Sequence, residues 1–547
     1  MLSYRKLAMR VLGRPLHTGG SDSPRPASQR AAALILTAAM LTTLTAPAFA
    51  KEWYIEEGDI TVRAGETEGT NKVSQGENPE VEDTNTVITN SDKDKASSNT
   101  VTIEAKDKDD KVEVTLKDVN IDTSSRSEAA VSVTGEGNTN IELDGDNALK
   151  SDIYSSGISS SGSLTISGGE NDSLTAQGGS GADGIYSSGS LTISGGTVTA
   201  NGGSGGGGDG GDGIWSSGGV TISGGSTVTA NGGDGKDDYG GDGIRSDSGD
   251  VTISGGSTVT ANGGNGGNVS GDGIRSDSGD VTISGGTVKA TGGDSKDGYG
   301  GDGIRSGGVV TISGNTVNAA GGNGGKVGGY GICSFDRVAI SGGTVNAAGG
   351  NGGKVGGDGI YSNDIDLSGS LELTAKAGSP NGKALSQNGK ELNLDTIKDK
   401  LGPGAKVTTT DADGKVNQVS VPRPVEPEEP VIPEESSSSS DGGSATPSAP
   451  ASPLPGLTVT DKSGAVISYT STQSGNTLTV CVGRLTASLR ASLATLRQLR
   501  AEGIDTITFQ TILCSTTLSV DELLAMGGED AEAVLTHRLT ASSLTVG

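Results

Sequence analysis

Two sets of residues in this chain recur at a spacing that could support chemistry. The first set contains aromatic and arginine side chains, each one residue after an isoleucine: Tyr186, Trp215, Arg245, Arg275, Arg305 and Tyr361. Aromatic rings stack on the C–H faces of sugars, and guanidinium groups donate forked hydrogen bonds to hydroxyls or carboxylates. The sequence therefore predicts a sugar-binding row, in which Cys333 occupies one place. The alternative is a row of ordinary exposed strand residues, because strands favour aromatic side chains.

The second set is acidic and stands two residues before the same isoleucines. Its members are Asp183, Asp212, Asp242, Asp272, Asp302 and Asp358. Stacked carboxylates repel each other unless a cation lies between them, and Ca²⁺ takes oxygen ligands from flexible loops. The sequence therefore suggests Ca²⁺ as its one candidate cofactor. The alternative is a set of solvated Asp-Gly turns.

Catalytic chemistry has little support in the sequence. Beyond residue 50 the only histidine is His537, so Ser-His and His-metal mechanisms are disfavoured. Paired-carboxylate hydrolysis needs acids at singular positions, whereas the acids here recur with the repeat. We therefore predict no catalytic residues and a protein that is not an enzyme. A polysaccharide lyase with an arginine base is the enzymatic alternative.

The isoleucines that position both sets recur along the middle of the chain. They are Ile158, Ile185, Ile214, Ile244, Ile274, Ile304, Ile332 and Ile360, with gaps of 27, 29, 30, 30, 30, 28 and 28 residues. A nearly fixed period in this range indicates stacked supersecondary units. The unit at 241–264 reads as three short stretches, Gly-Ile-Arg-Ser, Val-Thr-Ile-Ser and Thr-Val-Thr-Ala, separated by glycine turns. Their apolar–polar alternation predicts strands with one buried face.

These units predict an all-β fold, a right-handed parallel β-helix (a solenoid) with three short strands per coil. The buried positions of one unit would be Ile244, Val251, Ile253, Val259 and Ala261. Stacking would place the isoleucines of the second strand in one column: Ile166, Ile193, Ile222, Ile253, Ile283, Ile312 and Ile340. A β-sandwich would not need near-identical strands about every thirty residues.

The flanking regions differ in composition from the repeats. Residues 1–50 are predicted to be a signal peptide, because basic residues precede the apolar run 31–44 and an Ala-Phe-Ala cleavage motif. Residues 51–84 form a predicted N-terminal cap and polar crossing. The β-helix spans 85–420, with regular repeats over about 153–378 and a C-terminal cap at 379–420.

A linker rich in proline, glutamate and serine is predicted at 421–455, followed by a small α+β domain at 456–547. Leucines at helical spacing predict a helix from Thr486 to Arg500 in that domain. Cys481 and Cys514 could form a disulfide there, which would leave Cys333 unpaired.

The net charge of the chain limits the classes of partner that it can bind. The net charge is −27 at pH 7, which disfavours nucleic acid and anionic membrane surfaces. No stretch after residue 50 has the length and apolar character of a membrane span. We therefore expect a secreted, extracellular protein, with or without attachment to a cell surface.

Several stretches carry a family resemblance. They are Val114–Asp122, Ala130–Thr134, Ile141–Asn147 and the following Gly-Ile and Val-Thr-Ile-Ser-Gly-Gly coils. Over about residues 85–378 the chain resembles secreted Gram-positive proteins with pectate-lyase-like β-helices, and is most similar to the carbohydrate-binding family that binds cellulose and pectic polymers without cleaving them. The long glycine turns depart from the compact coils of that family.

The resemblance implies a non-catalytic polysaccharide-binding protein that carries calcium in its coils, with the aspartates of the Asp-Gly-Ile turns as the best match. The expected partner is a plant cell-wall or mucin-type glycan, or a host or bacterial surface. The main alternative is a structural or adhesive surface protein that binds a protein partner.

Overall fold

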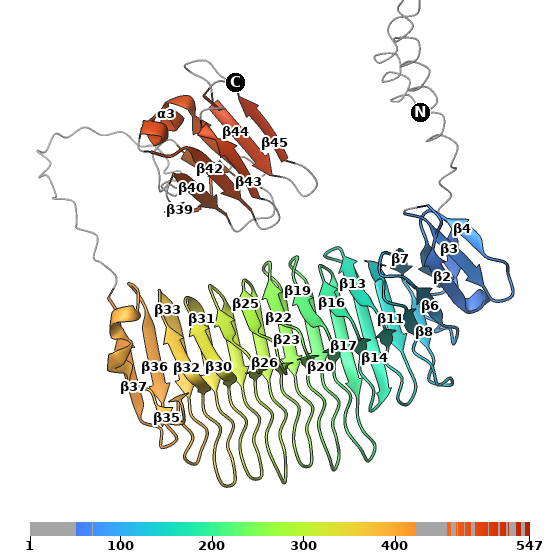
Figure 1. The fold of residues 1–547 in the computed structure, drawn as a ribbon, viewed down its shortest axis with the longest axis horizontal. Helices are drawn as coiled ribbons and strands as arrows, with labels where there is room; N and C mark the ends of the chain where they lie inside the picture. The colour runs from blue at the N-terminus through green and yellow to red at the C-terminus, as the bar shows by residue number, and fades with distance from the viewer. Residues whose placement is uncertain are drawn as a thin grey trace, which may run out of the picture. The chain divides into compact units, whose positions relative to one another are not determined.

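The computed structural model describes residues 51–67 and 69–422, and separate stretches between residues 457 and 546. The predicted signal peptide and most of the predicted linker lie outside the described residues. The structure has the predicted parallel β-helix, whose stacked coils are seen from the side in Figure 1. It was predicted to begin at residue 85, but Glu52–Tyr54 and Ile60–Ala64, in the predicted cap, already pair in parallel with strands of the coils. None of the helices described is long and apolar enough to cross a membrane.

Each regular coil contributes three strands, and equivalent strands of successive coils pair in parallel. The first column contains β2 (Ile60–Ala64), β6 (Val101–Glu104), β9 (Val131–Thr134), β12 (Ile158–Ser160), β15 (Ile185–Ser187), β18 (Ile214–Ser216), β21 (Ile244–Ser246), β24 (Ile274–Ser276), β27 (Ile304–Ser306), the first parts of β30 (Ile332–Ile340) and β32 (Ile360–Leu367), and β34 (Leu385–Gln387).

The second column contains β1 (Glu52–Tyr54), β5 (Val87–Thr89), β7 (Lys111–Lys117), β10 (Asn138–Asp144), β13 (Ser163–Gly168), β16 (Ser190–Ile193), β19 (Gly219–Ile222), β22 (Val251–Ser254), β25 (Val281–Ser284), β28 (Val310–Ile312) and the second parts of β30 and β32. The third contains β8 (Asn120–Asp122), β11 (Asp146–Lys150), β14 (Ser173–Ser180), β17 (Thr197–Gly203), β20 (Thr227–Asn231), β23 (Thr258–Asn262), β26 (Thr287–Thr291), β29 (Thr316–Ala320), β31 (Gly343–Ala348), β33 (Leu371–Lys376) and β36 (Lys406–Thr410).

The core is built as the alternation predicts. The seven isoleucines of the second column are fully buried, and the five core positions predicted for one unit are at most 1% exposed. Register places like on like, with Ile253 opposite Ile283 in the next coil. The first column also buries a line of serines whose hydroxyls donate to turn carbonyls, as Ser276 Oγ does to Gly249 O at 3.0 Å. These bonds meet the requirement that buried polar groups be paired.

Both ends of the stack are closed by antiparallel pairs. At the N-terminal end β2 pairs with β3 (Asn71–Gln75), which pairs with β4 (Val81–Asp83), beside the 3₁₀ turn η1 (Ile55–Glu57). At the C-terminal end β34 pairs with β35 (Lys390–Glu391) and β36 with β37 (Val416–Ser420), with η2 (Leu394–Thr396) and η3 (Lys398–Lys400) between them. Such pairs cover strand edges that would otherwise recruit other chains.

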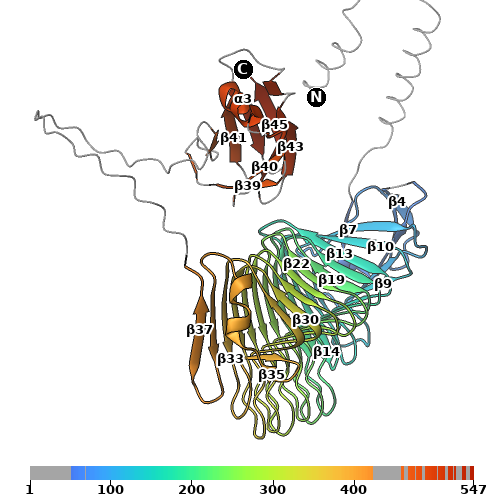
Figure 2. The ribbon, with the colours of Figure 1, turned by 60° about the vertical axis from the view of Figure 1, so that its left-hand side comes forward.

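Six glycine-rich loops connect the third column to the first, and we call them the glycine fin: residues 204–213, 232–243, 263–273, 292–303, 321–331 and 349–359. Figures 1 and 2 show them stacked side by side along one edge of the β-helix. Gly211 N–H donates to Gly203 O at 2.9 Å within one coil, and Gly233 N–H donates to Gly211 O at 2.8 Å in the next. This alternation continues through the fin to Gly378, so backbone bonds join the two arms of every loop.

The C-terminal module is described in part and contains two four-stranded sheets. One is β38 (Leu457–Thr460), β41 (Ala487–Ser492), β44 (Glu532–His537) and β45 (Ser542–Val546); the other is β39 (Thr470–Ser474), β40 (Thr477–Cys481), β42 (Thr506–Gln510) and β43 (Ser515–Ser519). The helix α3 covers only Leu493–Ala501.

The first half of the helix predicted from Thr486 to Arg500 was therefore wrong. Residues 487–492 form β41, in which alternate residues are buried and which pairs with both β38 and β44. Cys514, half of the predicted disulfide, lies outside the described residues, and Cys481 Sγ lies 3.5 Å from Gln510 Oε1.

Candidate binding site

The six residues of the predicted sugar-binding row lie in one line on the outer face of the first column. Strand register pairs Tyr186 with Trp215, Trp215 with Arg245, and so on through Arg275, Arg305 and Cys333 to Tyr361. Neighbours in this outer row are thus one coil apart. Register alone, however, leaves open whether the side chains are free to bind a ligand.

The arginines of the outer row are held by carboxylates. Arg245 Nε lies 3.0 Å from Asp247 Oδ1 and its Nη2 3.0 Å from Asp277 Oδ2. Arg275 Nε lies 2.6 Å from Asp277 Oδ1, and Arg305 Nη1 lies 3.3 Å from Asp302 Oδ2. Each of the three side chains is only about a third exposed. Each guanidinium is therefore paired with at least one carboxylate of the protein.

The aromatic members of the outer row contact their neighbours. The rings of Tyr186 and Trp215 meet edge to face with centroids 5.2 Å apart, and Arg245 Cζ lies 5.2 Å from the Trp215 ring. Tyr361 stacks on Tyr330 at 5.1 Å. Cys333 is fully buried, and burial raises the pKa of its thiol, so it is a poor nucleophile at neutral pH. The middle of the outer row is a packed, internally paired strip.

The predicted metal-binding aspartates form a buried ladder, with every side chain at most 9% exposed. The Oδ1 atom of each accepts a backbone N–H from the following coil: Asp183 from Asp212 at 2.7 Å, Asp212 from Asp242 at 2.5 Å, Asp242 from Asp272 and Asp272 from Asp302 at 2.6 Å, Asp302 from Tyr330 and Asp358 from Lys383 at 2.7 Å. Each of these hydrogen bonds therefore links one coil to the next.

Burial sets the charge state of this ladder. Desolvation, with repulsion between neighbouring carboxyls second, raises the pKa of Asp242 and of Asp272 to about 7. Desolvation also raises the pKa of Asp183 to about 6, and raises the pKa values of Asp212, Asp302 and Asp358. Part of the ladder therefore carries protons near neutral pH, which relieves the repulsion that a cation was expected to relieve.

Calcium takes six to eight oxygen ligands, and one oxygen of each ladder carboxyl already accepts a backbone N–H. A calcium ion in the coils would therefore take its ligands from the second carboxyl oxygens and from backbone carbonyls. Across the described ranges no three His, Cys, Asp or Glu side chains are grouped so as to hold a metal ion. The hydrogen bonds give the buried aspartates a structural role, and calcium in the coils stays a prediction.

The outer row continues beyond Tyr186 toward the N-terminus as a line of hydroxyls: Ser159, Ser132, Thr102 and Thr61. These four residues, together with Tyr154, Tyr186 and Arg126, line a hollow of about 730 Å³, which we call the hydroxyl hollow. Tyr154 is 84% exposed and stands in the turn between β11 and β12 with φ at 62°. An exposed ring thus flanks a floor of polar groups.

The rim of the hydroxyl hollow carries a fixed ion pair. Arg126 donates from Nη1 to Asp59 Oδ1 at 2.8 Å and from Nη2 to Asp59 Oδ2 at 3.1 Å, and Glu128 Oε2 lies 2.8 Å from Nη2. Partial burial alone would raise the pKa of Asp59, but hydrogen bonds from Arg126 and the Thr100 N–H lower it overall. The rim therefore holds two carboxylates and one guanidinium.

The predicted sugar-binding row included one residue of the hydroxyl hollow, Tyr186, and none of the others that line it. Ser159 follows Ile158 as Tyr186 follows Ile185, so counting back one unit could have extended the row. Tyr154 lies in an irregular turn outside the repeat pattern. The Arg126–Asp59 contact joins residues 67 apart in the chain, and no spacing in the sequence indicates it.

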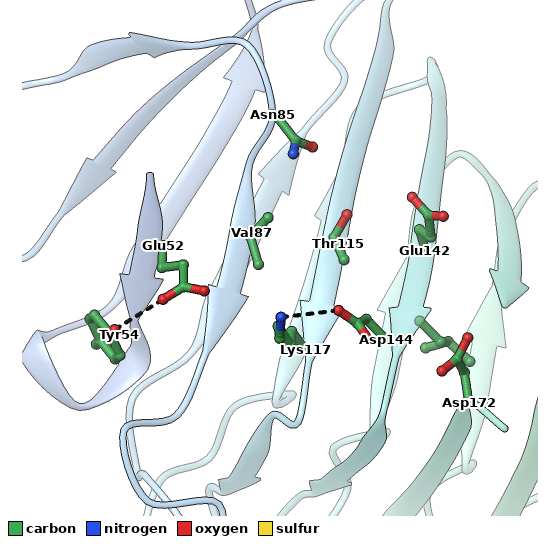
Figure 3. A pocket seen from close by; sticks show the side chains of 10 residues that line it. Glu52, Tyr54, Asn85, Val87, Thr115, Lys117, Glu142, Asp144 and Asp172 are labelled. Atoms are coloured by element: carbon green, nitrogen blue, oxygen red, sulfur yellow. Dashed lines mark hydrogen bonds and ion pairs between the residues drawn. The ribbon is translucent and has the colours of Figure 1, made fainter. Parts of the chain in front are cut away.

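A second open hollow lies on the outer face of the second column, across β1, β5, β7 and β10 (Figure 3). Its side chains are mainly acidic: Glu52, Glu142, Asp144 and Asp172, with Lys117 Nζ 3.4 Å from Asp144 Oδ2. Its one aromatic residue, Tyr54, donates its hydroxyl hydrogen to Glu52 at 3.0 Å. This hollow lacks the paired rings and the hydroxyl floor.

Comparison with known proteins agrees with the architecture. A family model described as Beta helix repeat matches residues 220–244 and 281–304, each stretch running from a buried valine of the second column to a buried isoleucine of the first. No curated protein and no solved structure matches the chain. The protein is therefore a parallel β-helix protein built from β-helix repeats.

Proposed function

We propose that this is a secreted, non-catalytic polysaccharide-binding protein that holds its ligand in the hydroxyl hollow. The observation that supports this most directly is the combination of two tyrosine rings, Tyr154 and Tyr186, with four hydroxyls in strand register. Sugar rings have apolar C–H faces and equatorial hydroxyls, so they suit a site that offers both kinds of surface.

Rigidity supports the same proposal. The floor hydroxyls lie on consecutive strands about 4.8 Å apart, where backbone pairing fixes their positions. A preorganised site loses less entropy on binding than a loop that must first be ordered. The outer row beyond Tyr186 adds to this, since the Trp215 ring packs against the Tyr186 ring and Arg245 lies over Trp215 in turn.

The local charge favours a neutral glycan over a polyuronate. The two carboxylates of Asp59 and Glu128 outnumber the single guanidinium of Arg126, which is already occupied by both. The arginines of the outer row are likewise paired with aspartates. Within the plant cell-wall and mucin-type glycans expected from the resemblance, we therefore propose cellulose-like or other neutral polymers as the ligand class.

The test is a glycan-binding panel with matched tyrosine variants. The purified protein is measured against cellulose oligomers, neutral mucin-type glycans and polygalacturonate by calorimetry and affinity electrophoresis. Tyr154→Ala and Tyr186→Ala should each weaken retention by roughly tenfold or more, because each removes a stacking face. Tyr54→Ala, in the acidic hollow of Figure 3, is the control and should bind as the unaltered protein does.

Failure to bind any member of the panel would overturn the proposal. Loss of binding in Tyr54→Ala alone would move the site to the acidic hollow. Release of unsaturated or reducing ends would show catalysis and remove the non-catalytic part of the proposal.

A second candidate function is a structural or adhesive role through contact with protein. It is favoured by a line of tyrosine and valine residues on the glycine fin, of which Tyr239, Tyr299 and Val355 are exposed. Binding to a protein surface with unchanged affinity in Tyr154→Ala and Tyr186→Ala would support this candidate.

A further inference from the structure

In five of the six loops of the glycine fin, an apolar residue stands five positions before the isoleucine that follows the loop; in the first loop Asp209 holds that position. The five residues are Tyr239, Val269, Tyr299, Val327 and Val355, and parallel β-bridges join each to the next. Tyr239, Tyr299 and Val355 are 53%, 50% and 42% exposed, among the most exposed large apolar side chains in the described residues. Val269 and Val327, which lie between them, are half-buried. We call this set of five the apolar line. Exposed apolar side chains gathered in this way commonly mark an interaction site.

The fin presents the apolar line at fixed spacing. Backbone bonds between glycines join each loop to both neighbours, as Gly241 N–H donates to Gly233 O and Gly264 N–H to Gly241 O. With one residue per coil, the five side chains span roughly 19 Å. The line is therefore a rigid linear surface, which a flat partner can cover without paying to order the loops.

Charged side chains beside the apolar line are distributed unevenly. Asp237 and Asp238 precede Tyr239 at its N-terminal end, while Lys326 and Lys354 precede Val327 and Val355 at its C-terminal end. The loop of Tyr299, at the centre, carries Lys296 with the exposed Asp294 and Asp297. Asp237, Lys326 and Lys354 are exposed, and Asp238 is half-buried. The Tyr239 loop also carries Lys236 and the exposed Asp234, so the N-terminal end keeps a net negative charge.

We propose that the glycine fin is a self-association surface, through which two copies of this chain pair antiparallel about a two-fold axis at Tyr299. In that arrangement Tyr239 packs against the partner's Val355, and Val269 against the partner's Val327. Asp237 and Asp238 face the partner's Lys354, and Lys296 faces the partner's Asp297. A two-fold interface requires such a self-complementary patch.

The charge distribution favours a second copy of the chain as the partner, and it favours the antiparallel orientation. A parallel pairing would place lysine on lysine and aspartate on aspartate, which is unfavourable. A neutral glycan would gain nothing from a surface that is acidic at one end and basic at the other. The contact is narrow, so the dimer is expected to be weak, with a dissociation constant on the order of micromolar or above.

The first test is sedimentation equilibrium of the purified protein over a range of concentrations. The mass should rise from that of one chain to that of two and stop there, because the pairing is closed. Tyr299→Asp places two like charges at the axis and should raise the dissociation constant by on the order of a hundredfold. The control is Tyr54→Asp, outside the fin, which should leave the dimer intact. Circular dichroism checks that each variant retains its strands.

The second test is a charge swap. Lys354→Asp should abolish the dimer, and adding Asp237→Lys with Asp238→Lys should restore it. A protein that stays monomeric at all concentrations, or a dimer that Tyr299→Asp leaves unchanged, overturns the proposal. A monomer in which Tyr299→Asp abolishes glycan retention would assign the apolar line to a glycan site and equally overturn it. The first two outcomes leave the hydroxyl hollow untouched, because the tyrosine variants there test it separately; the third would also place glycan binding outside that hollow.

Discussion

Asp272 shows how a buried carboxyl can serve the fold in this protein. Its Oδ1 accepts the Asp302 N–H at 2.6 Å, its own N–H donates to Asp242 Oδ1 at 2.6 Å, and its Oδ2 lies 3.8 Å from Arg275 Nη1. The pKa of about 7 means that burial and the neighbouring carboxyl outweigh the arginine. At this residue the hydrogen bond, and not the negative charge, stabilises the folded state.

The substitution Asp272→Asn tests that statement. Asparagine keeps the Oδ1 acceptor and removes the charge, so we expect a gain of about 1–3 kcal/mol in unfolding free energy at pH 8 and a smaller gain at pH 5. Urea denaturation at both pH values measures it. The matched control is Asp250→Asn, because Asp250 accepts the Asp280 N–H at 2.9 Å in the same way but is exposed. Destabilisation of Asp272→Asn at pH 8 would show that attraction to Arg275 dominates.

Part of this site was predictable residue by residue. Asp242 stands two residues before the inward-facing Ile244, so the alternation already placed its side chain inside, although the Asp-Gly pair suggested a solvated turn. The outer row was located because its members share one offset from an isoleucine. The pairing of Arg245 with Asp277 depends on contacts across coils and on side-chain direction, which spacing does not give.

At the scale of elements, the glycine fin depends on close approach of backbones. A Cβ on Gly233 would lie 2.2 Å from Gly203 O, whereas a Cβ on Gly207 would have no atom within 4 Å. We expect Gly233→Ala to lower the unfolding free energy by about 2–4 kcal/mol, because coils must separate locally to admit the methyl group. Gly207→Ala, in the same fin, should change it little.

Chemical denaturation of both alanine variants provides the measurement. Equal stability of the two variants would mean that neighbouring coils of the fin are not in contact in solution. It would also remove the rigidity on which the proposed dimer depends, although the core columns would be unaffected.

The elements differ in how well sequence predicts them. The β-helix strands followed from alternating apolar residues repeated in register, and the prediction is confirmed. Glycine loops carry no such pattern, because the bonds that order them are made by backbone alone. In the C-terminal module Leu485, Leu489 and Leu493 fit a helical period, but pairing of residues 487–492 with two neighbouring strands decides for β41.

For the molecule as a whole, the donor set of the aspartate ladder predicts that its stability does not depend on calcium. We expect the melting temperature of the purified protein to be the same in excess chelator and in excess Ca²⁺, because backbone N–H groups and not cations occupy the Oδ1 atoms. Differential scanning calorimetry in the two conditions measures this. A lower melting temperature in chelator would contradict this prediction and would show that bound calcium stabilises the coils.

The ladder also predicts how stability changes with pH. The pKa of Asp183 is about 6 and the pKa values of Asp242 and Asp272 are about 7, all above the value of about 3.9 in an unfolded chain. Between these limits the folded chain binds more protons than the unfolded chain, so stability falls as pH rises. The contribution is complete below about pH 4 and lost above about pH 7. We therefore expect a lower melting temperature at pH 8 than at pH 5.

Surface charge also lowers the stability of the folded chain as pH rises. The net charge is −27 at pH 7, and repulsion between the negative groups grows as the remaining carboxyls ionise. The triple variant Asp242→Asn, Asp272→Asn, Asp302→Asn separates the two causes. The three asparagines keep their acceptor oxygens but cannot titrate, which leaves only Asp183, Asp212 and Asp358 as titrating groups of the ladder. The melting temperature of this variant should therefore fall less between pH 5 and pH 8 than that of the unaltered protein. Added salt should reduce the surface contribution in both proteins and leave the difference between them. Equal slopes in the two proteins would assign the whole pH dependence to the surface and none to the ladder.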